Sequence, residues 1–169
     1  MSWTLQPQGL AAGPLHVSFQ RFVRPASGRV AAAPSSLGAL PVAACGAAFL
    51  LPVAAGEAFW IGLSVTPGAA VRLLITAERR DGTSMPLAPV LVPPSRGVAG
   101  VPAGPQFAVF DAELAALILH GSTAARIEIA DPATFAARTG VAAPAPPDPA
   151  AAYGGWRLPG CQRPGRPML

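Results

Sequence analysis

The stretch from Gly38 to Gly56 carries no charged residue, and it decides whether the chain crosses a membrane or folds around a sheet. A helical span needs about twenty mainly apolar residues, and this stretch just reaches that length. However, Pro41 and Pro52 interrupt it, and much of the remainder is alanine, which contributes little to insertion. Short apolar runs bounded by glycine and proline are typical of buried strands. We therefore expect sheet core here and no membrane span.

Several other segments alternate with the period of two that is typical of half-buried strands. In residues 15–24 one face is mostly apolar but includes Arg21, and the opposite face is mostly polar. Residues 71–78 and 126–129 alternate in the same way. Asp81-Gly82 predicts a hairpin, because the tight primed turns that join antiparallel strands require positive φ angles.

The segment Asp111 to Gly121 has the signals of a helix, with Asp111 as a cap and His120-Gly121 as a C-terminus. Residues 131–140 are compatible with one or two further helical turns that begin at Pro132. Strands separated by turns at intervals of about ten residues indicate an antiparallel β-sandwich with one short helix. We expect this sandwich in residues 1–140, followed by an extended, proline-rich C-terminal arm in residues 141–169.

Charged residues make up only 12% of the chain, and all 12 basic residues are arginine. Codon bias in a GC-rich genome explains why the basic residues are all arginine. For the low share of charged residues there are two alternative explanations, the same codon bias or a surface that another protein partly covers. Cys45 and Cys161 fit neither a disulfide framework nor a zinc pattern. The N-terminus lacks the features of a signal peptide, so we expect a cytoplasmic protein.

The residues that could support catalysis are few and scattered. His16 falls on the polar face of an expected strand, His120 falls at an expected helix end, and Cys45 lies in an apolar run without an adjacent base. Glu57 opens the most apolar strand, where it either pairs with an arginine or acts as an acid or base. No metal-ligand spacing and no phosphate-binding loop is present in the sequence. We therefore expect no catalytic, cofactor-binding or metal-binding residues.

The arm combines aromatic and basic residues without the apolar periodicity of a core. The basic residues of the chain are too sparse and scattered to predict nucleic-acid binding. We expect the arm to bind a protein partner, either a second copy of the chain or other subunits of an assembly. The residues expected to bind it are Tyr153, Trp156, Arg157, Arg163 and Arg166.

Three functional hypotheses follow from these patterns. The first is a non-enzymatic structural or interaction subunit of a larger protein assembly, which docks through the arm. The second is a small ligand-binding β-sandwich module that uses the loop of residues 94–105. The third is an enzyme that uses Glu57 or Cys45.

Four short motifs occur in an order that resembles a family of uncharacterised bacterial and fungal proteins. They are Phe19 to Arg21, Glu57-Ala58 with Trp60, Gln106-Phe107, and Tyr153-Gly154 with Trp156. The chain lacks the acidic turn residues and the longer central region associated with that family, so it resembles a shortened member. The family has no established activity, and the resemblance therefore implies no catalytic residue.

Overall fold

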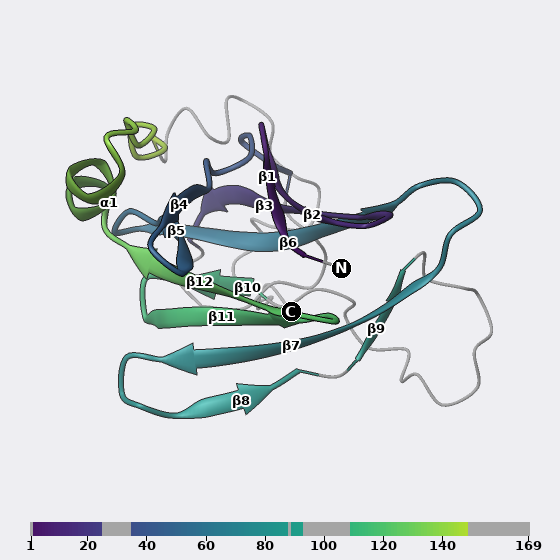
Figure 1. The fold of residues 1–169 in the computed structure, drawn as a ribbon. Coiled ribbons are helices and arrows are strands. Elements are labelled where there is room, and N and C mark those ends of the chain that lie inside the picture. The colour runs from purple at the N-terminus through teal and green to yellow at the C-terminus, as the bar shows by residue number, and fades with distance from the viewer. Residues whose placement is uncertain (1, 25–34, 88, 93–108, 149–169) are drawn as a thin grey trace, which may run out of the picture.

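The computed structural model describes residues 2–24, 35–87, 89–92 and 109–148, which form two β-sheets and one short helix (Figure 1). The strands of one sheet are β1 (Thr4–Gln6), β2 (Gly9–Ala12), β3 (Leu15–Val23), β6 (Glu57–Val65) and β10 (Val109–Asp111). Those of the other are β4 (Ala43–Cys45), β5 (Ala48–Pro52), β7 (Val71–Arg79), β8 (Ser84–Pro86), β9 (Val90–Val92), β11 (Leu114–His120) and β12 (Ala124–Ala130).

The two sheets pack face to face as a β-sandwich, as expected (Figure 1). The five-stranded sheet has the order β1-β2-β3-β6-β10. The seven-stranded sheet has the order β4-β5-β12-β11-β7-β8, and β9 also pairs with β7. Among the described strands, every pairing is antiparallel except that of β5 with β12, which is parallel.

The core lies between the inner faces of the sheets and is built from aromatic and branched side chains. Phe19 on β3 meets Phe59 on β6 edge to face, with ring centroids 6.0 Å apart, and Phe110 follows at 5.5 Å from Phe59. Such tilted and edge-on contacts are favourable beyond the area that they bury. From the facing sheet the fully enclosed side chains are Leu51, Leu73, Leu117, Leu119 and Ile127.

The uncharged stretch of residues 38–56 forms strands β4 and β5 and their flanks, as predicted. Leu51 packs into the core between the sheets, whereas its neighbour Leu50 packs into a second cluster on the opposite face of the same sheet. A strand that is covered on both faces needs apolar residues at consecutive positions. That requirement explains the consecutive buried apolar residues from Leu50 to Ala54.

The alternation predicted for residues 15–24 is confirmed in β3 as far as Arg21, but it ends there, because Phe22 on the opposite face is also buried. Leu15, Val17 and Phe19 are buried, and the residues between them are only partly covered. Arg21 continues the inward-facing row, so a guanidinium group is placed at the end of an apolar face.

The hairpin predicted at Asp81-Gly82 joins β7 to β8. Gly82 has a φ angle of 85°, which a residue with a side chain rarely adopts. Asp81 Oδ1 accepts hydrogen bonds from the Thr83 backbone N–H at 2.9 Å and from the Thr83 hydroxyl at 2.6 Å. These contacts fix the turn by local side-chain chemistry.

The helix predicted between Asp111 and Gly121 is wrong, because this segment forms part of β10 and the whole of β11. β11 pairs with β7 on one side and β12 on the other. The carboxylate of Asp111 accepts a hydrogen bond from the Glu113 backbone N–H at 3.0 Å within a turn. The alanine and leucine content favours a helix locally, but ladder hydrogen bonds on both edges and burial of Leu117 and Leu119 favour a central strand.

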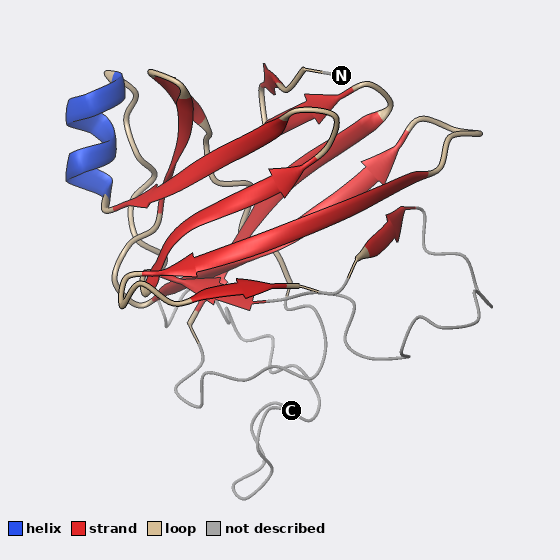
Figure 2. Cartoon of the chain, turned by 60° about the horizontal axis from the view of Figure 1, so that its bottom comes forward, coloured by secondary structure: helices blue, strands red, loops and turns tan. Residues whose placement is uncertain are grey.

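The helix of the described chain is α1 (Pro132–Thr139), which follows β12 directly. Asp131 caps it by accepting from the Thr134 backbone N–H at 2.9 Å, and Gly140 ends it in the left-handed conformation. Figure 2 shows the helix at one margin of the sandwich. Phe135 is fully buried against the outer side of β4 and β5, together with Ala43, Leu50 and Ala130.

Candidate functional site

The most unusual feature of the described core is a buried ion pair at one end of the sandwich. Arg21 lies near the end of β3, and Glu57 is the first residue of β6. Because Arg21 stands opposite Phe59 in the antiparallel register, Glu57 is its diagonal neighbour on the same inward face. Arg21 is 8% exposed and Glu57 is 2% exposed.

Each group of the pair has a second partner on the main chain. Arg21 Nε lies 2.5 Å from Glu57 Oε1, and Arg21 Nη2 donates to the Ala145 carbonyl oxygen at 2.6 Å. The other carboxylate oxygen, Glu57 Oε2, accepts from the Ala54 backbone N–H at 3.0 Å. The pair therefore joins β3, the connection between β5 and β6, and the segment that follows α1.

The connection between β5 and β6 is one of the points at which the chain crosses from one sheet to the other. Val53 N–H donates to the Ala130 carbonyl at 2.9 Å, and Glu57 N–H donates to the Ala54 carbonyl at 3.1 Å. Arg24 N–H closes the same corner by donating to the Gly56 carbonyl at 2.9 Å. The backbone N–H of Ala54, from which the Glu57 carboxylate accepts a hydrogen bond, thus belongs to a connection whose neighbouring residues are hydrogen-bonded to both sheets.

Burial determines the electrostatics of this pair. Loss of hydration raises the pKa of Glu57 above its ordinary value, and the Ala54 N–H and the Arg21 charge offset that rise only in part. Oε2 accepts a hydrogen bond from the Ala54 N–H, and Oε1 forms a close ion pair with Arg21 Nε that lacks the direction of a hydrogen bond, so the arrangement is suited to holding chain segments together. Pairing with an arginine is one of the two roles expected for Glu57 from the sequence, and the structure identifies that arginine as Arg21.

A signal for this pairing was present in the sequence. Arg21 interrupts the apolar row of one strand, and Glu57 opens the most apolar strand of the chain. Two opposite charges that each face a core require a partner. Connecting them, however, required the register between β3 and β6, which the sequence does not provide.

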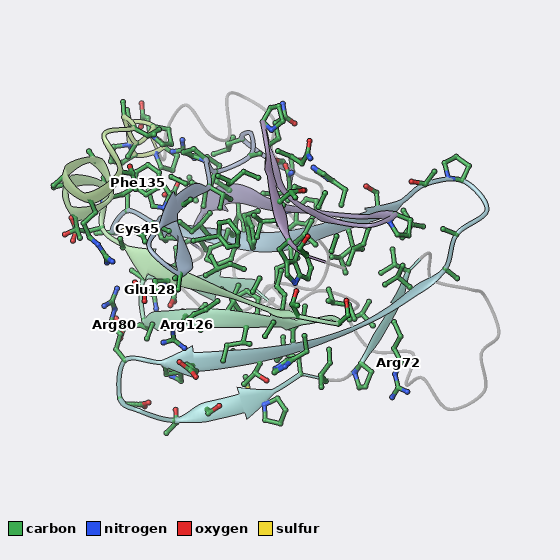
Figure 3. The ribbon with its side chains drawn as sticks, viewed as in Figure 1. Cys45, Arg72, Arg80, Arg126, Glu128 and Phe135 are labelled. Atoms are coloured by element: carbon green, nitrogen blue, oxygen red, sulfur yellow. The ribbon has the colours of Figure 1, made fainter. Side chains whose placement is uncertain are left out.

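Cys45 lies at the end of β4, is partly buried and is a free thiol. Figure 3 shows it on the same side of the sandwich as Phe135 of α1. The side chain of Cys45, ahead of that of Glu128, raises the pKa of Arg138 in the last turn of α1. His120 lies on β11, which is separated from β4 by β5 and β12 in the sheet. It forms a hydrogen bond with the Thr76 hydroxyl at 2.9 Å.

His16 lies in the other sheet, on β3, opposite Ser64 of β6. Among the described strands, neither histidine therefore lies on a strand that pairs with β4. Glu57 and Cys45 also belong to different sheets.

A row of charged side chains crosses the outer side of the seven-stranded sheet (Figure 3). Arg138 of α1 lies 3.2 Å from Glu128, Arg126 lies 3.8 Å from Glu128, and Arg126 lies 2.7 Å from Glu78. All four side chains are about a third or more exposed, and surface pairs of this kind stabilise a fold only slightly. This row neutralises its own charges.

Arg80, at the hairpin tip, is exposed but also donates hydrogen bonds to the main chain of neighbouring segments. Its Nε donates to the Ala112 carbonyl at 2.7 Å, and its Nη2 donates to the Ile129 carbonyl at 3.2 Å. Arg80 therefore links the hairpin to β12 and to the turn before β11. Arg79 has a looser ion pair with Asp81, at 3.9 Å.

The residues predicted to bind a partner lie outside the described part of the chain, and so does the candidate ligand loop of residues 94–105. The partner-binding set is Tyr153, Trp156, Arg157, Arg163 and Arg166. The described part of the arm, residues 141–148, runs without helix or strand from α1 to the Arg21 contact and on to Asp148.

No family model, curated protein or solved structure matches this chain. The resemblance drawn from the four sequence motifs therefore stays a prediction. Within the residues that the structure describes, no group of three or more His, Cys, Asp or Glu side chains is placed to hold a metal ion. In the same residues no helix is long and apolar enough to cross a membrane.

Proposed function

We propose that this chain is a non-enzymatic structural subunit of a larger cytoplasmic protein assembly, and that it docks on its partner through the arm of residues 141–169. The observation that carries the proposal is the fixed start of the arm. Arg21 Nη2 binds the Ala145 carbonyl at 2.6 Å, and Ala143 packs beside the cluster under α1. An arm that leaves the body from a fixed point loses less freedom when its far end binds than a wholly free chain does.

The composition of the arm supports a protein surface as its target. Tyr153 and Trp156 are of the residue types that most often anchor interfaces. The many prolines restrict the unbound arm and so reduce the entropy that docking removes. These residues therefore suit an extended segment that lies along a partner.

Charge indicates which kind of surface the arm prefers. All 8 acidic residues of the chain precede Pro149, and the residues beyond it include Arg157, Arg163 and Arg166 with no carboxylate side chain. Arginine forms paired hydrogen bonds with carboxylates and also stacks on aromatic rings. We therefore expect the docking surface, on a second copy or on another subunit, to be acidic.

The enclosed position of Glu57 also favours a structural role over a catalytic one. Its two oxygens are engaged by Arg21 and by the Ala54 N–H, and only 2% of the residue is exposed. A general acid or base needs contact with the proton that it transfers.

The proposal is tested by deleting residues 149–169, which leaves the Arg21 contact in place, and measuring mass by size-exclusion chromatography with light scattering. The matched control keeps the full length and changes only Tyr153 and Trp156 to alanine. We expect the full chain to run as an assembly, either purified or in its lysate, the deletion to run near the monomer mass in the same sample, and the double substitution to weaken association. An assembly of unchanged mass after the deletion would contradict the proposal.

A further inference from the structure

One guanidinium group holds two parts of the chain that are far apart in sequence. Arg21 binds Glu57 through Nε and the Ala145 carbonyl through Nη2. Arg21 and Ala145 are 124 residues apart in the sequence. The contact is a direct link between the inner face of the sandwich and the described part of the arm.

The chemistry of the arm explains why this link runs through a carbonyl. Pro144, Pro146 and Pro147 surround Ala145 in the sequence, and proline has no backbone N–H to donate. Carbonyl oxygens are therefore the main hydrogen-bonding groups of this segment, and they need a hydrogen-bond donor from the sandwich. Arg21 supplies that donor from inside the sandwich.

Glu57 gives the guanidinium its orientation. The arginine side chain is a planar fork, so the close ion pair of Nε with Oε1, together with the hydrogen bond of Nη2, limits how far the guanidinium can turn. Glu57 itself is fixed by the Ala54 N–H at 3.0 Å. A buried pair is not needed for stability alone, because apolar residues of similar volume often serve as well.

We propose that the Arg21–Glu57 pair is a latch that seats Ala145 and so fixes the direction in which the C-terminal arm leaves the sandwich. The latch rests on the proposed function in one respect, since a set direction matters only if the arm docks on a partner. Arg21 acts as a positioning residue for the arm, and Glu57 acts through Arg21. Opening the latch frees the arm while the sandwich stays folded.

The test compares two variants with wild type in the isolated full-length chain. The double variant Arg21→Met with Glu57→Leu replaces the pair by apolar groups, and Arg21→Lys keeps the charge but removes the fork. The control is Arg24→Met, which removes the neighbouring partly exposed arginine that pairs with Asp111. The readout is the rate at which elastase cuts between Val141 and Ala143, identified by intact mass, with a urea unfolding curve for each protein.

We expect the double variant and Arg21→Lys to be cut roughly tenfold faster than wild type, because a hydrogen bond to a charged group is lost. The urea midpoint of the double variant should stay close to that of wild type, and Arg24→Met should be cut at the wild-type rate. Wild-type cutting rates in folded variants would overturn the latch. If the double variant does not fold, Arg21→Lys decides in the same way.

Assembly mass, measured on the same proteins, separates this inference from the proposed function. If deleting residues 149–169 leaves assembly intact, docking through the arm fails, and the cutting rates still decide whether the arm is latched. If the deletion abolishes assembly but the faster-cut variants assemble as tightly as wild type, the directional role of the latch is overturned. Weaker assembly of those variants supports the latch.

Discussion

At the scale of single residues, the buried ion pair of Arg21 and Glu57 combines a large cost of dehydration with a close attraction between opposite charges. Glu57 and Arg21 are removed from water and gain each other and two main-chain partners in return. The two charges depend on each other, because either group alone is a buried charge without its counter-ion. This dependence leads to two predictions.

Arg21→Met should lower the free energy of unfolding by about 3 to 5 kcal/mol at neutral pH, because it leaves the Glu57 carboxylate buried and unpaired. Adding Glu57→Leu should recover most of that loss. Urea unfolding of the two singles and the double measures the coupling. The exposed pair between Arg126 and Glu78 is the control, and Arg126→Met should cost about 1 kcal/mol or less. If Arg21→Met and Arg126→Met lower the free energy of unfolding equally, burial does not increase the contribution of the Arg21–Glu57 pair to stability.

The raised pKa of Glu57 sets the sign of a pH effect. The folded protein holds the Glu57 proton more tightly than the unfolded chain does, so this group stabilises the fold most below its ordinary pKa of 4.5. That contribution is lost as the pH rises through the raised folded pKa. The unfolding free energy of wild type minus that of the Arg21→Met, Glu57→Leu variant should therefore fall over this window. If this difference in unfolding free energy rises with pH instead, folding lowers the pKa of Glu57, which would contradict the prediction.

At the scale of elements, coverage on both faces decides what the apolar segments become. β11 is a central strand although its sequence suggests a helix, and β5 is apolar throughout because α1 covers its outer side. The helix is held chiefly through Phe135, whose ring reaches the cluster of Ala43, Leu50 and Ala130. Helix α1 is therefore an integral cover of the sheet and leads the chain to the arm.

Phe135→Ala should destabilise the protein by about 3 kcal/mol or more, because it empties the centre of this second cluster. Phe135→Leu keeps most of the volume and should cost much less. Urea unfolding followed by far-ultraviolet circular dichroism measures both. If Phe135→Ala unfolds at the wild-type midpoint, α1 is not packed on the sheet.

The sequence predicted much of this architecture but not its connections. Alternation in residues 15–24, the Asp81-Gly82 turn and the proline-interrupted apolar run each correspond to an observed strand or hairpin. The segment 111–121 was mistaken for a helix because Ala and Leu carry high helix propensity, whereas pairing on both sides is a tertiary effect. The Arg21, Glu57 and Ala145 contact depends on strand register and on the return of the chain after α1, and neither leaves a local signal.

At the scale of the whole molecule, the proposed account divides the chain into a sandwich that provides a fixed base and an arm that binds. The acidic residues are confined to the part before Pro149, and the rest of the arm is basic. Attraction of that basic segment to an acidic surface should weaken as salt screens it. The assembly should therefore dissociate more readily at high ionic strength, as measured by size-exclusion chromatography with light scattering at several salt concentrations.

The most direct test of the central claim is the native mass of the full-length chain, both purified and in its own lysate. Size-exclusion chromatography with light scattering on the purified protein, and with antibody detection on the lysate, measures it. Docking through the arm predicts a mass well above the 17.0 kDa of one chain in at least one of the two samples. A chain that runs at 17.0 kDa in both would contradict the account.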